Sequence, residues 1–382
     1  MTIIKIGDIT QITSGYAFQS KCFNEEGKGI PLIRIRDVGK NESKTYYKGD
    51  YSEEYIVKKG DFLISMDGEF KIAQWKGKIG LLNQRVCKIE ANEHFIDSKY
   101  MYYLLPRELQ KIEDTTSFVT VKHLSIKQIK DIEVSLPPME EQKKIVAILD
   151  KIQALIEKRK EAIAKLDELV QAVFLDMFGD LSMNPKGWGI REFSYFAKID
   201  TNMIKDFTEY GNYPHIGIDN IEKNTGRLIH YKSVEEDRLT SGKYIFTEEH
   251  IIYSKIRPYL NKVALPNLKG LCSADAYPIL INKENTNRYF FAYILRSKYF
   301  LDYVEKLSNR TNIPKVNKKQ LEGFSCIAPP TQLQDEFANI VLNIEANKAK
   351  LDKSLYKMED NFNSLLQKAF KGELKINIEI TA

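Results

Sequence analysis

The feature that most constrains this chain is a proline-rich junction that occurs twice, each time before a long heptad pattern. The first copy reads Leu136-Pro137-Pro138-Met139-Glu140-Glu141-Gln142. The second copy reads Ala328-Pro329-Pro330-Thr331-Gln332-Leu333-Gln334. Pro329 follows Pro137 by 192 residues, about half of the 382-residue chain. Two copies of one domain-plus-helix plan predict two similar working surfaces joined by a spacer.

After the first junction, apolar residues recur at spacings that alternate between four and three. This pattern is typical of a coiled-coil seam. It predicts a helix over residues 140–178, which the two prolines precede and Gly179 ends. One basic residue, Arg159, interrupts the seam. The predicted seam residues are Ile145, Leu149, Ile152, Ile156, Ile163, Leu166, Val170 and Val173.

A second helix is predicted over residues 331–371, with the same seam displaced by 192 positions and Lys348 as its interruption. A narrow apolar stripe must be buried against a partner. We expect the two stripes to pair within the chain as antiparallel helices. Pairing with other chains, as an oligomerisation zipper, stays open. The seam residues are Phe337, Val341, Ile344, Leu351, Leu355, Met358, Phe362 and Leu365.

The stretches before each helix alternate short apolar runs with turn residues, which is typical of β-rich domains. We therefore expect an α+β fold with a pseudo-two-fold internal repeat, in which two β-rich domains are separated by two long antiparallel coiled-coil helices. The predicted division is a first domain at 1–139, a spacer helix at 140–179, a second domain at 180–330, a second spacer helix at 331–372 and a tail at 373–382.

Composition narrows the function classes without choosing one. The net charge of +5 is mildly basic, which permits a nucleic-acid partner but does not demand one. The four cysteines form no Cys-x-x-Cys pair, so a zinc ribbon is not expected. The N-terminus reads as a strand rather than a signal peptide, and no run of eighteen apolar residues occurs. We expect a cytoplasmic protein with reduced thiols.

Motifs for catalysis are absent from the sequence. It contains no phosphate-binding P-loop, no Gly-x-Gly-x-x-Gly after a strand and no Asn-Pro-Pro-Tyr/Phe motif of amino-methyltransferases. The five histidines show no metal-ligand spacing. Asp61, Glu69 and Lys71 resemble the spaced acidic pair and lysine of metal-dependent nucleases, but the second half does not repeat them. We expect no catalytic site, no metal and no cofactor on this chain.

Polar loops in both β-rich regions suit nucleic acid better, because they mix basic, amide, hydroxyl and aromatic side chains. Arg34 and Arg36 lie two apart in a predicted strand, Pro31–Val38, and so share a face. Any single member could be an ordinary solvated side chain, so the prediction rests on the sets. The first set is Tyr16, Gln19, Arg34, Arg36, Lys76, Lys78, Asn83, Gln84, Arg85, Thr116 and Lys122. The second set is Lys205, His215, Asn220, Lys255, Arg257, Tyr259, Asn261, Lys262, Arg310, Asn312 and Lys315.

The doubled Pro-Pro-x-x-x-Gln junction, each copy opening a heptad helix, resembles the specificity subunit of Type I DNA restriction–modification systems. Four local motifs are similar to that family: Gly60-Asp61-Phe62-Leu63-Ile64-Ser65, Asn184-Pro185-Lys186-Gly187-Trp188, Ser254-Lys255-Ile256-Arg257-Pro258-Tyr259-Leu260 and Phe370-Lys371-Gly372-Glu373-Leu374. The resemblance implies that each β-rich domain is a target recognition domain reading half of a bipartite, asymmetric sequence in double-stranded DNA. It also implies that the two helices set the gap between the half-sites.

The same resemblance implies a non-catalytic subunit that recruits two modification (methyltransferase) subunits and, for phage defence, restriction subunits. S-adenosylmethionine, ATP and Mg²⁺ are then expected only on those partners. Residues outside the seams are candidates for docking them, namely Gln142, Lys143, Lys158, Gln334 and Lys357. Two alternatives stay open: a specificity module of another methylation-based defence system, and a coiled-coil scaffold whose globular ends bind proteins.

Overall fold

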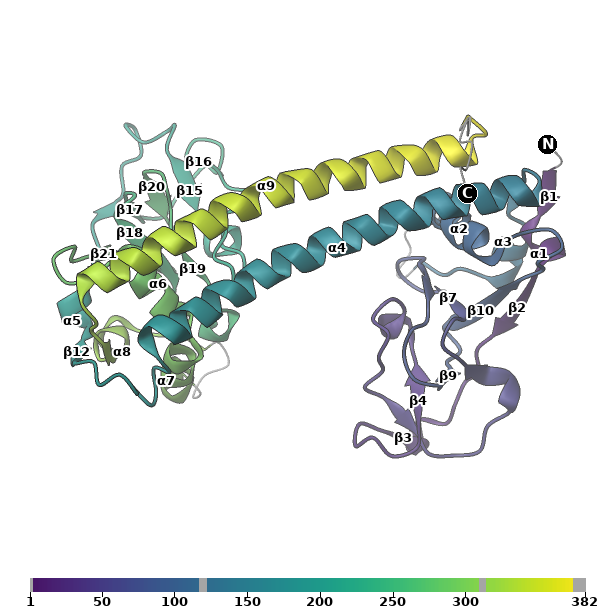
Figure 1. The fold of residues 1–382 in the computed structure, drawn as a ribbon, viewed down its shortest axis with the longest axis horizontal. Helices are drawn as coiled ribbons and strands as arrows, with labels where there is room; N and C mark the ends of the chain where they lie inside the picture. The colour runs from purple at the N-terminus through teal and green to yellow at the C-terminus, as the bar shows by residue number, and fades with distance from the viewer. Residues whose placement is uncertain (1–2, 117–121, 309–313, 374–382) are drawn as a thin grey trace. The chain divides into compact units, whose positions relative to one another are not determined.

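The computed structural model describes residues 3–116, 122–308 and 314–373. The chain forms two compact units. Unit 1 comprises Met1–Lys160 with Ser354–Ala382, and unit 2 comprises Glu161–Lys353. Each unit holds one β-rich region and half of each long helix, α4 (Met139–Phe178) and α9 (Thr331–Phe370) (Figure 1). The two predicted helices are confirmed, and no helix among the described residues is long and apolar enough to cross a membrane.

Unit 1 contains three sheets, with two, four and five strands. The two-stranded sheet pairs β1 (Ile3–Lys5) with β11 (Glu133–Ser135). The four-stranded sheet has the order β2 (Thr10–Ser14), β10 (Val86–Ala91), β7 (Phe62–Ser65) and β8 (Ile72–Gln74). The five-stranded sheet has the order β3 (Phe23–Asn24), β5 (Tyr46–Tyr47), β4 (Ile30–Ile33), β9 (Gly80–Leu82) and β6 (Ile56–Val57). The helices are α1 (Ile6–Ile9), α2 (Ser98–Thr115) and α3 (Ile126–Lys130), with 3-10 turns η1 (Ser20–Cys22), η2 (Ile35–Asp37) and η3 (Glu53–Tyr55).

Unit 2 repeats this plan with the same three sheet sizes, which confirms the internal repeat. The two-stranded sheet pairs β12 (Ile190–Glu192) with β22 (Ser325–Ile327). The four-stranded sheet has the order β13 (Ala197–Ile199), β21 (Ala276–Ile281), β18 (His250–Ser254) and β19 (Val263–Ala264). The five-stranded sheet has the order β14 (Met203–Ile204), β17 (Lys243–Phe246), β20 (Gly270–Cys272), β15 (Pro214–Ile216) and β16 (Lys232–Ser233). The helices are α5 (Phe193–Phe196), α6 (Arg288–Arg296), α7 (Lys298–Ser308) and α8 (Lys318–Glu322), with η4 (Ile218–Asn220) and η5 (Pro258–Leu260).

Helices α4 and α9 pack against each other inside each unit. In unit 1, Leu149 near the start of α4 shares a core with Ala369 near the end of α9. In unit 2, Phe174 near the end of α4 shares a core with Phe337 near the start of α9. Early residues of one helix meet late residues of the other both times, so the helices are antiparallel and pair within the chain. All sixteen predicted seam residues are buried or half-buried.

The glutamine of each junction ties its long helix to the β-rich region. Gln142 is 1% exposed, accepts a hydrogen bond from the Asp97 backbone N–H at 2.9 Å and donates to the Pro137 carbonyl at 3.0 Å. Gln334 is fully buried and makes the equivalent bonds at the start of α6. Both amides are therefore structural, and the prediction that these two glutamines dock a partner is wrong.

The predicted strand Pro31–Val38 is only half correct. Strand β4 stops at Ile33, and the chain then folds into the 3-10 turn η2. The Asp37 carboxylate accepts a hydrogen bond from the Arg34 backbone N–H at 2.9 Å, and this side-chain bond replaces the next strand pairing. Arg34 and Arg36 therefore do not share a strand face, contrary to the prediction.

Candidate nucleic-acid interface

Three predicted residues of unit 1 come together where the segment after β2 meets the segment after β9. The Gln84 backbone N–H donates to the Tyr16 carbonyl at 3.0 Å, and Arg85 follows directly. A Cβ on Gly15 would lie 2.1 Å from the Asn83 carbonyl oxygen, so the close approach requires glycine there. Tyr16 is 51% exposed and stacks on Tyr55 at 5.1 Å. The result is a surface strip of one aromatic, one amide and one guanidinium.

Other predicted members of the first set have partners inside unit 1. Lys122 donates to the Glu113 carbonyl at 2.7 Å, and Thr116 donates to the Ile112 carbonyl at 2.6 Å. Arg36 donates to Thr45 at 2.8 Å. The structure places Asn83 in the interior and leaves Gln19, Lys76 and Lys78 on the surface, with Arg34 half-buried.

Sequence reasoning missed one residue of this surface, His123. Its Nδ1 lies 2.6 Å from the Asp67 carboxylate, which also lies 3.3 Å from Arg85. The signal that could have found it is the repeat, because His123 is the counterpart of the predicted Lys315 at the 192-residue offset. The cluster of His123, Asp67 and Arg85 borders the strip of Tyr16 and Gln84.

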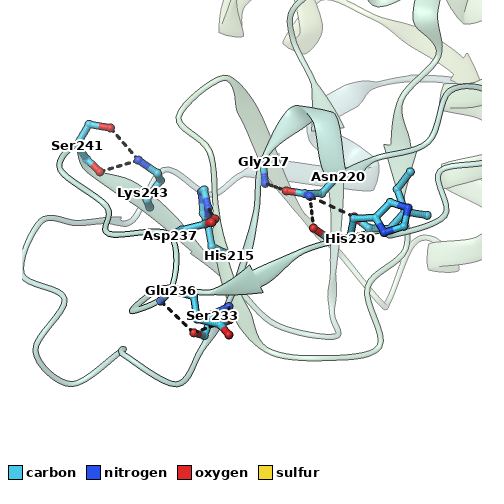
Figure 2. A network of polar contacts seen from close by, with 10 residues as sticks. His215, Gly217, Asn220, His230, Ser233, Glu236, Asp237, Ser241 and Lys243 are labelled. Atoms are coloured by element: carbon cyan, nitrogen blue, oxygen red, sulfur yellow. Dashed lines mark hydrogen bonds and ion pairs between the residues drawn. The ribbon is translucent and has the colours of Figure 1, made fainter. Parts of the chain in front are cut away.

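Two predicted residues of unit 2 lie in a polar network inside the β-rich region (Figure 2). His215 on β15 is 9% exposed, and its Nδ1 lies 2.7 Å from the Asp237 carboxylate. The Asn220 amide donates to the Ile229 carbonyl at 3.1 Å, and its oxygen accepts from the Gly217 backbone N–H at 2.8 Å. His215 ties β15 to the segment after β16, and Asn220 ties η4 to the segment before β16.

Two more members of the second set form hydrogen bonds inside unit 2. Asn261 is 8% exposed and donates to the Arg296 carbonyl at 2.9 Å. Lys262 is half-buried and donates to the Ile218 carbonyl at 2.7 Å.

The exposed members of the second set gather around the turn between β18 and β19. Arg257 and Lys315 are exposed, and Tyr259 is 50% exposed. Lys255 is half-buried and donates to the Ala274 carbonyl. Lys205, on the segment after β14, is also exposed. The predicted residues Arg310 and Asn312 lie outside the described residues.

The nuclease-like residues do not assemble. Glu69 pairs with Lys71 at 2.7 Å, whereas Asp61 accepts a hydrogen bond from the Lys58 backbone N–H at 2.8 Å. Within residues 3–116, 122–308 and 314–373, no group of three or more His, Cys, Asp or Glu side chains could hold a metal ion.

Comparison with known proteins identifies what this architecture resembles. Residues 1–167 and 185–357 match the family model described as the Type I restriction modification DNA specificity domain. The EcoDI specificity subunit of Escherichia coli is 30% identical over 350 residues, covering 82% of this chain and 77% of that protein. The EcoBI specificity subunit of Escherichia coli is 41% identical over 168 residues, covering 44% of this chain and 35% of that protein.

Solved structures support the same fold. A crystal structure of the S subunit of a Type I restriction–modification system from M. genitalium aligns with a TM-score of 0.57 and 15% identity, covering 97% of this chain and 96% of that chain. A chain from a structure of type I R-M system assembly aligns with a TM-score of 0.53 and 14% identity, covering 98% of each. At these identities the likeness concerns the fold alone.

Proposed function

Because the chain belongs to the Type I restriction–modification specificity family, we propose that it reads a bipartite, asymmetric sequence in double-stranded DNA. Unit 1 reads one half-site and unit 2 the other. The observation that best supports this proposal is that the units share one sheet plan but differ in their exposed polar side chains. Tyr16, Gln84 and Arg85 occupy the surface in unit 1, whereas Arg257, Tyr259 and Lys315 do so in unit 2. A shared framework with different outer side chains suits two different half-sites.

The chain acts without catalysis of its own in this proposal. It recruits two modification subunits, and restriction subunits where the system has them, and those partners carry S-adenosylmethionine, ATP and Mg²⁺. It works in the cytoplasm, where the DNA and the partners are. The target recognition domains correspond to residues 1–139 and 180–330. Lys143, Lys158 and Lys357 remain candidates for docking, because all three side chains are exposed on the long helices.

The long helices set the gap between the half-sites. Each helix has 40 residues and runs without a break through both units. At 1.5 Å rise per residue this corresponds to about 60 Å of helix. Removing one heptad from both helices, in positions that keep the seam register, should change the number of unread base pairs in the methylated sequence. An unchanged gap would rule out this role.

The proposed function is tested by mapping modified adenines in DNA from cells that express this chain with its methyltransferase. The expected result is a motif of two different half-sites separated by an unread gap. A single continuous motif would contradict reading by two units. A protein-binding scaffold predicts no modified motif at all and no salt-dependent DNA affinity.

A further inference from the structure

The turn between β18 and β19 holds an arginine in an unfavourable backbone conformation. This turn, residues 255–261, is called the Arg257 turn below. Arg257 and Asn261 both have φ of +50°, and they flank η5. The left-handed region is readily visited by glycine and asparagine, but an arginine pays a steric penalty there. Arg257 therefore carries a steric cost that a glycine at this position would not have.

Neighbouring segments impose the conformation. The Arg257 backbone N–H donates to the Pro314 carbonyl at 2.8 Å, and the Val316 backbone N–H donates to the Lys255 carbonyl at 2.9 Å. The buried Asn261 side chain anchors the other end of the turn on Arg296. These bonds fix the backbone of Arg257 and with it the direction of the Cα–Cβ bond. The side chain it presents is exposed.

Three basic side chains, those of Lys255, Arg257 and Lys315, gather at this turn. Ile256 and Lys315 form a β-bridge, which brings Lys315 beside the Arg257 turn. Burial first, and then repulsion from Lys315, lowers the pKa of Lys255. Among the described residues, neither Arg257 nor Lys315 forms an ion pair with a carboxylate. Such a cluster suits an anion that comes from outside the chain.

The matching turn of unit 1 has the opposite character. Gly68 donates to the Lys122 carbonyl at 3.0 Å, as Arg257 does to Pro314, and has φ of +74°. Glycine adopts that conformation freely. Its neighbours Asp67 and Glu69 are acidic and are paired with Arg85 and Lys71, at 3.3 and 2.7 Å. A glycine is therefore enough for this backbone, and what distinguishes the turn of unit 2 is the side chain of Arg257.

We propose that the Arg257 turn is a phosphate-binding site for the DNA backbone, with Arg257 as the main contact and Lys315 beside it. The site rests on the proposed function and gives unit 2 a backbone contact that unit 1 lacks at its matching turn. A contact to phosphate positions the domain on DNA but carries no sequence information.

The test uses the full chain with its methyltransferase and a duplex that contains the modified motif. Arg257→Gly removes the guanidinium and the strain together, and Arg257→Lys keeps the charge. The matched control is Arg238→Gly, an exposed arginine with φ of +48° in unit 2 that follows Glu235-Glu236-Asp237. Affinity is measured by equilibrium titration at several salt concentrations, and folding is checked by thermal unfolding.

Arg257→Gly should bind about tenfold more weakly and should reduce the slope of log affinity against log salt by about 0.9, the value for one phosphate. Its Tm should be unchanged or raised, and its modified motif should be the same. Arg257→Lys should keep most of the slope, and Arg238→Gly should keep all of it.

Wild-type affinity and slope in Arg257→Gly would overturn the site while leaving the proposed function intact. A changed motif would also overturn it, because Arg257 would then read a base. Absence of DNA binding by the wild-type complex would overturn both proposals.

Discussion

The two units share a backbone arrangement at one turn but carry side chains of opposite charge there. The turn after β7 and the turn after β18 make the same backbone hydrogen bonds to a following segment, yet one carries Asp67 and Glu69 and the other Lys255 and Arg257. The junctions show the reverse, since Gln142 and Gln334 are the same residue, and each donates to the carbonyl of a junction proline and accepts from a backbone N–H that precedes a helix. In these two comparisons the repeated side chains build the framework, and the divergent ones lie in the turns.

The long helices show a second contrast inside the seam. Ile156 in unit 1 is 2% exposed and apolar, whereas its counterpart in unit 2, Lys348, is 6% exposed and pairs with Asp167. The remaining interruption, Arg159, is half-buried in unit 1. The charge of Lys348 is therefore paired with a carboxylate from the facing helix, whereas unit 1 has an apolar side chain at the matching position.

The largest stability effect is expected at the junction glutamines. Gln142→Leu or Gln334→Leu leaves buried backbone groups without partners, which should lower the free energy of unfolding by about 2–4 kcal/mol. Chemical denaturation of the full chain measures it, with the exposed Gln171→Leu as control, expected within about 0.5 kcal/mol of wild type. A negligible loss in either variant would break the claim that the two junctions are equivalent.

The next largest effect on stability is expected when the residue types at Ile156 and Lys348, the matching positions of the two seams, are exchanged. Ile156→Lys buries a charge in an apolar seam and should cost about 2 kcal/mol or more. Lys348→Ile should change stability by no more than about 1 kcal/mol, because the side chain of its partner Asp167 is 57% exposed and can return to water. Equal losses of unfolding free energy in the two variants, measured by denaturation, would contradict the claim that only the seam of unit 2 accommodates a charge at this position.

A smaller effect on stability is expected from substitutions at Gly68 and Arg257, the matching left-handed positions of the two turns. Gly68→Ala should destabilise unit 1 by about 1–2 kcal/mol through backbone strain alone, because no heavy atom lies within 4 Å of the added Cβ. Arg257→Gly should be neutral or stabilise unit 2 by up to about 1 kcal/mol. Thermal unfolding of both variants tests this, and a loss of stability in Arg257→Gly would contradict the strain at that turn.

The smallest effect is a pH dependence confined to unit 2. Burial lowers the pKa of His250 below 6.5, and its Nδ1 accepts a hydrogen bond from the Thr247 backbone N–H at 3.0 Å. The unfolded chain therefore takes up the proton first, so this contribution to stability is present above about pH 6.5 and falls as pH drops below it. His250→Asn keeps an acceptor without titrating and should flatten stability between pH 7 and pH 5. If stability in the variant depends on pH as it does in the wild type, His250 is not the source of the pH dependence.

Periodicity made the helices and the repeat predictable from sequence, because a heptad seam behind paired prolines has few alternatives. The same reasoning failed at Arg34 and Arg36, where a hydrogen bond from the Arg34 backbone N–H to the Asp37 carboxylate ends the strand. It also took Gln142 for a surface residue, because its position outside the seam does not reveal the loop before α2 that covers it. Side chains whose role depends on a distant loop cannot be assigned from spacing alone.

The most direct test of the central claim replaces residues 180–330 with the matching region of a relative that has a different target. Modified adenines are then mapped in cells that express the chimaera with its methyltransferase. If each unit reads its own half-site, one half of the motif changes while the other half and the gap stay the same. A change in both halves, or in neither, would contradict independent reading by the two units.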